Sequence, residues 1–355
     1  MPIRIVDLAG TPREMGRQFG EELREESRAM VETRLVLATQ AAGRLDPSRD
    51  RRWCLNLAAE AVPALEAYSP PVYEEFAGIA DATGLSLPEL VIGNGWTDFK
   101  DLLDARGASH NCTSFAVGAP LTADGHTYLA QTWDMNVTAA PYIVAVRRRP
   151  SDGPRTLSLT TAGCLSLIGM NEHGVALGNT NLVPTDARPG VFYLALIHEA
   201  LRQQDLAGAV AAITRGPRMS GHYYHLGDGT DEFAGLETTG TRHARVGLQD
   251  GRYVHTNHYL TEELLGSAPM VPPSASSAAR QRRCSELVAK LPSGVTVTEL
   301  SQIMGDHEGV NCICRHIEPG AEWASLAAAA MAPATRQMRV WAGTPCQNDV
   351  TRLEP

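Results

Sequence analysis

The sequence has no long hydrophobic run and no excess of basic residues. Its alanine-rich stretch, SLAAAAMAP at residues 325–333, is much shorter than the roughly 20 apolar residues that cross a membrane. Residues 1–20 lack the apolar segment of a signal peptide and include acidic side chains, so we expect a cytoplasmic protein with no membrane partner. The formal net charge of −9 argues against a nucleic-acid partner.

Basic residues occur only in short clusters. RRR at residues 147–149 and RQRR at residues 280–283 are too short to form a basic surface for a nucleic acid. We expect both clusters to be solvated faces or strand ends.

Cysteine is also scarce. The chain has seven cysteines in 355 residues, and the number is odd. This low density does not fit the disulfide framework of a small secreted protein, and most of the cysteines are expected to be small buried hydrophobes. Cys312 and Cys314 are separated by one residue, whereas zinc knuckles use C-x-x-C spacing. We therefore expect no metal and no cofactor.

The usual catalytic signatures are missing as well. The sequence contains no G-x-S-x-G elbow, Walker loop, G-x-G-x-x-G or H-E-x-x-H motif. The histidine pairs His222/His225 and His255/His258 are three positions apart, and such positions face opposite sides of a strand. The pairs are therefore predicted to be separate, hydrogen-bonded histidines.

The pattern of apolar residues divides the chain near Gly107. Residues 1 to about 106 are predicted to be mostly helical, with helical spacing over residues 14–40 and a capping box at Ser86 and Glu89. After Gly107, apolar runs of about 5 to 8 residues alternate with turn signals, which indicates antiparallel strands. The remaining expectations are helices at residues 190–215, 277–291 and 297–304, weak strands at 323–331 and 336–342, and a surface loop or linker at 267–280.

This order of elements indicates an α+β fold. Runs of strands, then a pair of helices, then more strands favour stacked layers over βαβ alternation. Two packed sheets with helices outside both of them account for the pattern.

One segment, HNCTSFAVG at residues 110–118, stands out from the rest. Cys112 opens a predicted strand directly after a loop and is followed by two hydroxyl residues. Taken alone, Cys112 is either a buried structural cysteine or a nucleophile, and the local residues favour the structural reading.

The wider set of motifs changes this balance. GHTYLAQTWDM, GMNEHGVALGNTNL, RYVHTNHYL and CICRH follow in that order, and MGRQFGEELRE and EEFAGIADATGLSLPELVIGN precede them. Together they resemble the acyl-coenzyme A:6-aminopenicillanate acyltransferase family of self-processing N-terminal nucleophile hydrolases. The resemblance spans roughly residues 10–318.

The resemblance implies a four-layer αββα sandwich and a precursor that cuts itself between Asn111 and Cys112. A helical chain of residues 1–111 would stay associated with a catalytic chain of residues 112–355. The terminal Cys112 would then attack the acyl group of a small-molecule N-acyl amine. Whether the protein forms a homo-oligomer is left open.

Three further catalytic residues are implied by motif position. Asp134 would hydrogen-bond the α-amino group of Cys112, and the alternative is a turn carboxylate. Asn257 would stabilise the oxyanion, and the alternative is an ordinary polar residue at a strand end. Arg315 would lower the thiol pKa or bind an anionic substrate group, and the alternative is a surface salt bridge.

The candidate substrate-binding residues come from the same motifs. They are Gln131, Trp133, Asn179 and Asn181. The chain departs from the family at two places: Asn111 stands where glycine is common before the nucleophile, and Gln131-Thr132 stands where related sequences often have asparagine. Asn171 and Gly174 are expected to form a turn.

A terminal cysteine explains why no histidine motif is needed. Its α-amino group, with a pKa of about 7.7 to 8.0, can accept the proton of a thiol whose pKa is about 8.5. Before cleavage this nitrogen belongs to a peptide bond and cannot act as a base. The predicted activity is amide hydrolysis through a Cys112 thioester, with acyl transfer to an amine as the alternative and an inactive binding relative as a minor one.

Overall fold

The computed structural model describes residues 3–103, 112–268, 275–309 and 311–355, and its strands form two sheets. In spatial order the first sheet holds β1 (Arg4–Gly10), β4 (Ile143–Pro150), β5 (Thr156–Thr161), β6 (Ile168–Asn171), β7 (Ala176–Leu182), β8 (Gly221–Gly227), β9 (Phe233–Thr238) and β10 (His243–Val246). The second sheet holds β11 (Arg252–His255), β2 (Thr113–Val117), β3 (Tyr128–Asn136), β12 (Trp323–Ala332), β13 (Gln337–Ala342) and β14 (Val350–Leu353).

The two sheets pack face to face. Strand β3 contacts β7 and β8, and β12 contacts β6 across the space between the sheets. A polar pair crosses this space: Gln131 Nε2 donates to the Asn179 carbonyl at 2.6 Å, and Gln131 Oε1 accepts from the Asn179 amide at 2.9 Å. The two hydrogen bonds fix the relative position of β3 and β7.

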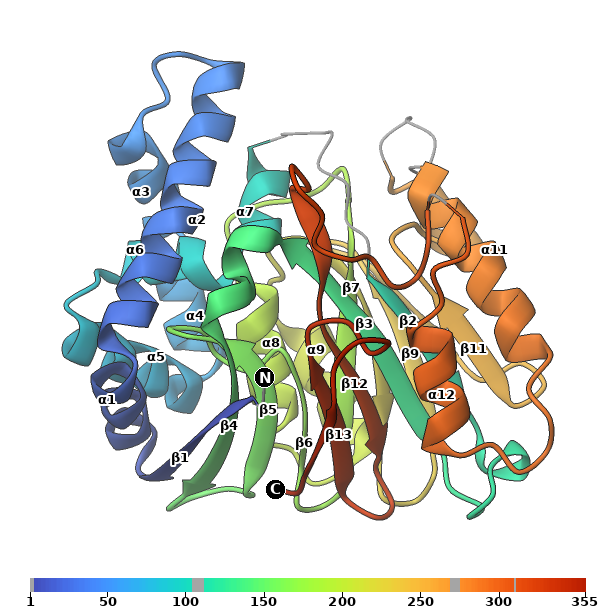
Figure 1. Ribbon diagram of the computed structural model, residues 1–355. Coiled ribbons are helices and arrows are strands. Elements are labelled where there is room, and N and C mark those ends of the chain that lie inside the picture. The colour runs from blue at the N-terminus through green and yellow to red at the C-terminus, as the bar shows by residue number, and fades with distance from the viewer. Residues whose placement is uncertain (1–2, 104–111, 269–274, 310) are drawn as a thin grey trace.

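Helices cover the outer face of each sheet (Figure 1). On the first sheet these are α8 (Tyr193–Ala200) and α9 (Leu206–Arg215), and on the second they are α11 (Ala275–Ala289) and α12 (Val297–Met304). The four-layer α+β sandwich predicted for the chain is therefore confirmed. Shorter pieces are α10 (Glu262–Leu265) and the 3-10 helices η1 (Ala119–Leu121) and η2 (Val137–Tyr142).

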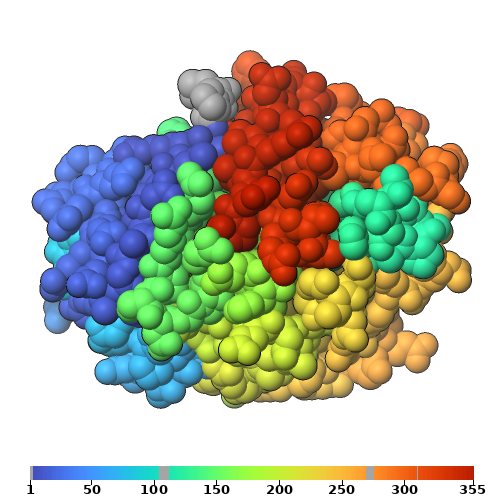
Figure 2. Space-filling view, turned by 90° about the horizontal axis from the view of Figure 1, so that it is seen from below, coloured from blue at the N-terminus to red at the C-terminus, as the bar shows by residue number. Residues whose placement is uncertain are grey.

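The N-terminal segment adds a helical unit at one side of the sandwich. It comprises α1 (Pro12–Glu22), α2 (Arg24–Leu45), α3 (Arg51–Ala59), α4 (Val62–Tyr68), α5 (Pro70–Thr83), α6 (Leu87–Asn94) and α7 (Trp96–Leu102). Helices α1 and α5 touch so closely that a Cβ atom on Gly16 would lie 2.0 Å from the Glu75 carbonyl oxygen. Figure 2 shows this segment, in blue, packed against the green part of the chain that holds β4 and β5. Within the described ranges, no helix combines the length and the apolar character needed to cross a membrane.

Two features of this segment differ from the sequence prediction. Residues 1–106 were expected to be mostly helical, but Arg4–Gly10 form β1, which pairs in parallel with β4. Val6 and Leu8 are buried on one face of β1, and this short alternation gains its partner from a distant part of the chain. The expected helix over residues 14–40 is interrupted at Leu23, which lets α1 pack on α5 while α2 packs on α6.

Most of the other expected elements are confirmed. The predicted helices correspond to α8 with α9, α11 and α12, and the weak strands correspond to β12 and β13. Ser86 and Glu89 form the predicted capping box at the start of α6. The loop predicted over 267–280 is wrong from residue 275 onward, because α11 begins there. Residues 269–274 lie outside the described part of the chain.

RRR at 147–149 was expected to be a solvated face or a strand end. It lies at the end of β4, which confirms the second alternative, but its middle residue is not solvated. Arg148 is buried, and its Nε lies 2.7 Å from Oε1 of the buried Glu75 on α5. Arg147 pairs with Asp7 nearer the surface. Alternate residues of a strand face opposite sides, so one arginine of the three points inward and needs a buried carboxylate.

Candidate active site

Cys112 lies directly before β2, a strand of the second sheet that pairs with β11 and β3. The residue is 7% exposed, and its Sγ lies 3.7 Å from the carbonyl oxygen of Asp134 on the neighbouring strand β3. Asn111 and the predicted cleavage bond lie outside the described residues. The cysteine side chain therefore faces β3 and Asp134, as the motif order implied.

Asp134 is buried and only partly hydrogen-bonded. Its Oδ1 accepts from Ser325 Oγ at 2.7 Å, while its Oδ2 has no hydrogen-bond partner among the described residues. Ser325 lies opposite Asp134 on β12, and the register shifts between Ser325 and Ala327. Such a bulge redirects side chains, and here it accompanies a hydroxyl that faces the carboxylate.

Arg280 joins the site to α11, and sequence reasoning missed it. Its side chain is fully buried and donates from Nη1 to the Cys112 carbonyl at 2.5 Å and to Thr113 Oγ1 at 3.0 Å. Nη2 donates to Asn257 Oδ1 at 3.0 Å, and Nε donates to Ser276 Oγ at 3.2 Å. The arginine therefore connects the backbone of Cys112 to the side-chain amide of Asn257.

RQRR at 280–283 was predicted to be a solvated face or a strand end. The segment lies within α11 and is not a strand end, and the solvated face is wrong for Arg280. Arg282 is exposed, but Arg280, Cys284 and Val288 are all buried on one face of α11. These residues are four apart, which is the spacing of one helix face. That periodicity was the available signal, and the charge of the cluster obscured it.

Asn257 follows β11 and is held from three directions. Its Oδ1 accepts from Arg280, its Nδ2 donates to the Asn181 carbonyl at 3.0 Å, and its backbone amide donates to Ser277 Oγ at 2.9 Å. An amide nitrogen has two N–H groups, so one of them is used by Asn181. The oxygen end of the amide is oriented by a cation, which turns the nitrogen end away from Arg280.

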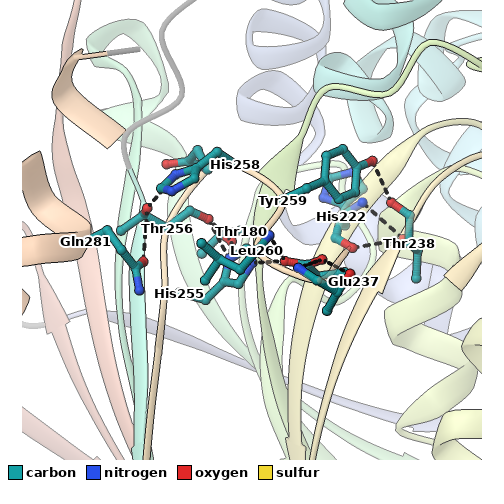
Figure 3. Close-up of polar contacts among 12 residues, drawn as sticks. Thr180, His222, Glu237, Thr238, His255, Thr256, His258, Tyr259, Leu260 and Gln281 are labelled. Carbon is teal, nitrogen blue, oxygen red and sulfur yellow. Dashed lines mark hydrogen bonds and ion pairs between the residues drawn. The ribbon is translucent and has the colours of Figure 1, made fainter. Parts of the chain in front are cut away.

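Buried polar contacts also fix the segment around Asn257 (Figure 3). His255 Nε2 lies 2.8 Å from Glu237 Oε1, and Glu237 also accepts from the Leu260 amide at 2.6 Å and from Thr261 Oγ1 at 2.6 Å. Burial alone would raise the pKa of Glu237, but hydrogen bonds from His255 and Thr261 lower it below its ordinary value. Glu237 is therefore a charged acceptor that holds both ends of the Asn257 segment.

The four candidate substrate-binding residues occupy different environments. The amide of Gln131 is used by the backbone of Asn179 between the sheets, and Trp133 is a buried core residue. Asn179 Nδ2 donates to the carbonyl of Leu167, the residue directly before β6. Asn181 is buried, and neither its Oδ1 nor its Nδ2 has a partner among the described residues. Asn181 is thus the candidate whose side chain keeps its hydrogen-bonding capacity.

The backbone of Arg315 is hydrogen-bonded to Ser325, the residue that contacts Asp134. Its amide donates to Ser325 Oγ at 2.9 Å, and its carbonyl accepts from the Ser325 amide at 2.8 Å. Its guanidinium has no ion pair or hydrogen bond with a described residue and is partly exposed. The charge of Arg315 nevertheless favours the ionised form of Asp134.

The predicted turn forms, and among the described residues three of the four paired histidines have the predicted hydrogen-bond partners. Asn171 Oδ1 accepts from the amides of His173 and Val175, which confirms the turn at Asn171 and Gly174. His222, His255 and His258 each have a polar side-chain partner, as predicted. His225 does not, because neither ring nitrogen has a partner in the described part of the chain.

The ionisation of the site follows from its burial. Burial raises the pKa of the Cys112 thiol to about 12, Asp134 adds to the increase, and Arg280 opposes it. Burial also raises the pKa of Asp134 to about 6, although Arg280, Ser325 and Arg315 favour its charged form. Burial lowers the pKa of Arg280 to about 10, so it stays charged at neutral pH. The thiol of the intact chain is therefore protonated at neutral pH and needs a base to become a nucleophile.

Comparisons with known proteins address the identity of the chain. A curated protein from Emericella nidulans, the 40 kDa form of acyl-coenzyme A:6-aminopenicillanic-acid-acyltransferase, is 25% identical over 258 residues, which are 72% of this chain and 69% of that protein.

Two solved structures are also similar. The Caenorhabditis elegans N-acylethanolamine-hydrolyzing acid amidase ortholog has 13% identity and a TM-score of 0.45, with 63% of this chain and 93% of that chain covered. Penicillin V acylase from Agrobacterium tumefaciens has 14% identity and a TM-score of 0.47, with 68% and 86% covered.

A family model matches a large part of the chain. The sequence model of the family described as acyl-coenzyme A:6-aminopenicillanic acid acyl-transferase matches residues 121–347, which is more than half of the chain. The matched range includes Asp134, Asn257, Arg280 and Arg315, and Cys112 precedes it. The resemblance read from the motifs is confirmed, and this chain is an enzyme that belongs to the acyl-coenzyme A:6-aminopenicillanic acid acyl-transferase family.

Proposed function

We propose that this enzyme is a self-processing cysteine amidohydrolase that cleaves an N-acyl amide through a thioester on Cys112. The observation that carries the proposal is the bridge made by Arg280 between the Cys112 carbonyl and the Asn257 amide. This bridge holds a nucleophile and a hydrogen-bond donor in one buried site, beside Asp134, whose carboxylate charge acts on the Cys112 thiol. Acyl transfer from an amide uses an activated nucleophile and an oxyanion donor, and a carboxylate can orient the base that activates the nucleophile.

The first step in the proposal is cleavage of the chain. The Cys112 sulfur attacks the carbonyl carbon of Asn111, the C–N bond breaks, and the acyl group of Asn111 moves to sulfur. The proton of the thiol ends on the Cys112 nitrogen, which becomes an amine. Water then hydrolyses this thioester and leaves residues 1–111 and 112–355. Strand β1 pairs with β4, so the two chains would remain associated through a shared sheet.

The amine released in this step completes the catalytic group. It accepts the thiol proton, and the thiolate attacks the substrate carbonyl. We assign Asp134 Oδ2, which has no partner among the described residues, as the acceptor for the resulting ammonium. The second N–H of Asn257 Nδ2 stabilises the oxyanion, and a donor of this kind contributes about 10² to 10³ in kcat.

The remaining steps follow from the same groups. The ammonium protonates the leaving amine, and the C–N bond of the substrate breaks. Water, deprotonated by the amine, then attacks the thioester and releases the acid. Arg280 takes no proton in these steps, and its role is to position Cys112 and Asn257.

Acyl transfer is the second candidate function, because the similar protein from Emericella nidulans is named an acyltransferase. The two reactions differ only in whether water or an amine attacks the thioester. We favour hydrolysis, because water is always present and a transferase must exclude it.

A substrate panel tests the proposed activity. N-acyl amino acids, β-alanyl amines and β-lactam amides are supplied to the cut protein with and without a competing amine, and products are identified by mass spectrometry. We expect free acid and free amine without the competing amine. A conjugate that dominates when it is added would assign the enzyme to acyl transfer, and no turnover of any amide by fully cut protein would contradict both functions.

The raised pKa of Asp134 predicts a pH-dependent stability of the uncut chain. In Cys112→Ala no amine forms beside the carboxylate, so the folded pKa of about 6 lies above the ordinary value of 3.8. A raised pKa contributes stability that is fully present below about pH 4 and is lost as the pH rises through 6. Between pH 4.5 and 7.5 this loss is about 2 kcal/mol.

The measurement is urea unfolding of Cys112→Ala and of Cys112→Ala with Asp134→Asn across that pH range. The difference between the two unfolding free energies should change by the stated amount, because asparagine does not titrate. Parallel pH profiles for the two variants would show that Asp134 ionises normally.

A further inference from the structure

A cluster of two imidazoles and two thiols lies outside the proposed catalytic group. It joins the loop after α12, which carries His307, Cys314 and His316, to Cys346 in the loop after β13. One ligand atom each from His307, His316 and Cys346 lies within 4.8 Å of the others. His316 Nε2 is 3.1 Å from Cys346 Sγ, and Cys314 Sγ is 3.5 Å from Cys346 Sγ.

We propose that this cluster binds a zinc ion through His307, His316 and Cys346, with Cys314 as the fourth ligand. In a tetrahedral zinc site, with Zn–S of about 2.3 Å and Zn–N of about 2.0 to 2.1 Å, two thiolates lie about 3.8 Å apart. A thiolate and an imidazole nitrogen lie about 3.6 Å apart in the same geometry. The distances from Cys346 Sγ to Cys314 and His316 are each within about half an ångström of these values.

His307 and Cys314 would both adjust to the ion, because Cys314 is not one of the residues whose ligand atoms all lie within 4.8 Å of one another. His307 and Cys346 are exposed, and the His307 ring lies edge-on to the His316 ring at a centroid distance of 5.1 Å. Two thiolates neutralise the two positive charges of zinc, and a mixed set of thiolate and imidazole ligands is typical of structural zinc.

His316 also has an outer partner of the kind that metal-bound histidines use. Its Nδ1 lies 3.4 Å from the side-chain amide of Gln347, which contacts Thr344 Oγ1 at 3.2 Å. Binding through Nε2 leaves a proton on Nδ1, which needs an acceptor. A half-turn of the Gln347 amide places its oxygen at His316 and its nitrogen at Thr344, and it preserves both contacts.

The position of this cluster links it to Asp134. Cys314 and His316 flank Arg315, whose backbone amide and carbonyl both bond to Ser325. Ser325 Oγ in turn donates to Asp134 Oδ1. A zinc ion here would fix the backbone that orients Ser325, and so it would act as a positioning group for the carboxylate.

The expectation of no metal came from the spacing of Cys312 and Cys314. The proposed ligands come from separate places in the chain, so spacing within one motif could not reveal them. Cys312 Sγ donates to the Cys314 carbonyl at 3.0 Å and is not one of the proposed ligands. This makes Cys312 a matched control in the same loop.

The test measures metal in the full chain, purified without a polyhistidine tag. We expect about one zinc per chain by atomic spectroscopy, and a thiolate-to-cobalt charge-transfer band when cobalt replaces zinc. In Cys346→Ser and His316→Ala, zinc should fall below about one tenth per chain. Cys312→Ser and the buried Cys54→Ser should keep the wild-type content. Cys314→Ser should lose about half of the cobalt charge-transfer intensity, because one of two thiolates is gone.

Several results would overturn the proposal. These are wild-type chain that binds neither zinc nor cobalt, unchanged zinc in Cys346→Ser, or an intact mass that shows a disulfide between Cys314 and Cys346 in place of metal. If a variant does not fold, the folded wild-type chain is used instead. A chelator removes its zinc and cobalt is then added, and the charge-transfer band shows whether the cluster binds metal. Metal content needs no turnover, so this result and the outcome for Cys112 are independent.

Discussion

Cys112→Ala should yield a single uncut chain without amidase activity. In our mechanism the thiol attacks both the Asn111 carbonyl and the substrate, so both reactions lose their nucleophile together. We expect turnover to fall by more than about 10³-fold, as for other enzymes that lose a covalent nucleophile. Intact mass spectrometry detects the cleavage, and amine release from the active substrate measures the turnover.

Two other variants sharpen this test. Cys54→Ala removes a different fully buried cysteine, on α3, and should be cut and active like wild type. Cys112→Ser keeps a weaker nucleophile at the same atom, and its slower cleavage would separate the chemistry from the fold. An uncut wild-type chain with full activity would be incompatible with our mechanism.

Replacement of Arg280 should have the next largest effect. Arg280→Met removes the donors to the Cys112 carbonyl and to Asn257 Oδ1, and it removes the cation that most favours the ionised form of the buried Asp134. Removing one partner from a buried charged network typically costs about 3 to 5 kcal/mol of stability. Cleavage and turnover should each fall by more than about 10²-fold, because Asn257 loses its orientation.

The measurements are urea unfolding, the rate of chain cleavage and kcat. Arg282→Ala is the matched control, because Arg282 lies on the exposed face of the same helix and should leave all three unchanged. Arg280→Lys keeps one charge but not the several donors, so it should recover stability more than kcat. Arg280→Met with wild-type cleavage would show that the bridge is dispensable.

The layers of the fold were accessible from the sequence because they depend on local periodicity. Apolar spacing distinguished the helical N-terminal part from the strands that follow Gly107, and Ser86 with Glu89 marked a helix start. Strand β1 was missed because it is short and its pairing partner β4 lies far along the chain. Local patterns do not reveal which distant strand completes a sheet.

The same distinction between local patterns and long-range contacts separates the site residues that were predicted from those that were not. The order of motifs brought together Cys112, Asp134 and Asn257, and among the described residues Arg315 is hydrogen-bonded to the group through its backbone at Ser325. Arg280 was not predicted, because arginine is usually exposed and only its distant partners make its burial favourable. Ser325 reaches Asp134 at a bulge in β12, and such a bulge has no clear sequence signal.

The pairing of β1 with β4 has a consequence for how the catalytic chain reaches its folded state. A gene that encoded only residues 112–355 would place cysteine at the start of the chain once the initiator methionine is removed, without cleavage at Asn111. Its β4 would then present an unpaired edge that includes its own apolar residues, IVAV at 143–146, and such edges template aggregation. In the proposed scheme the N-terminal segment would cover this edge as well as block the Cys112 nitrogen, and covalent linkage during synthesis would deliver it to β4 at high effective concentration.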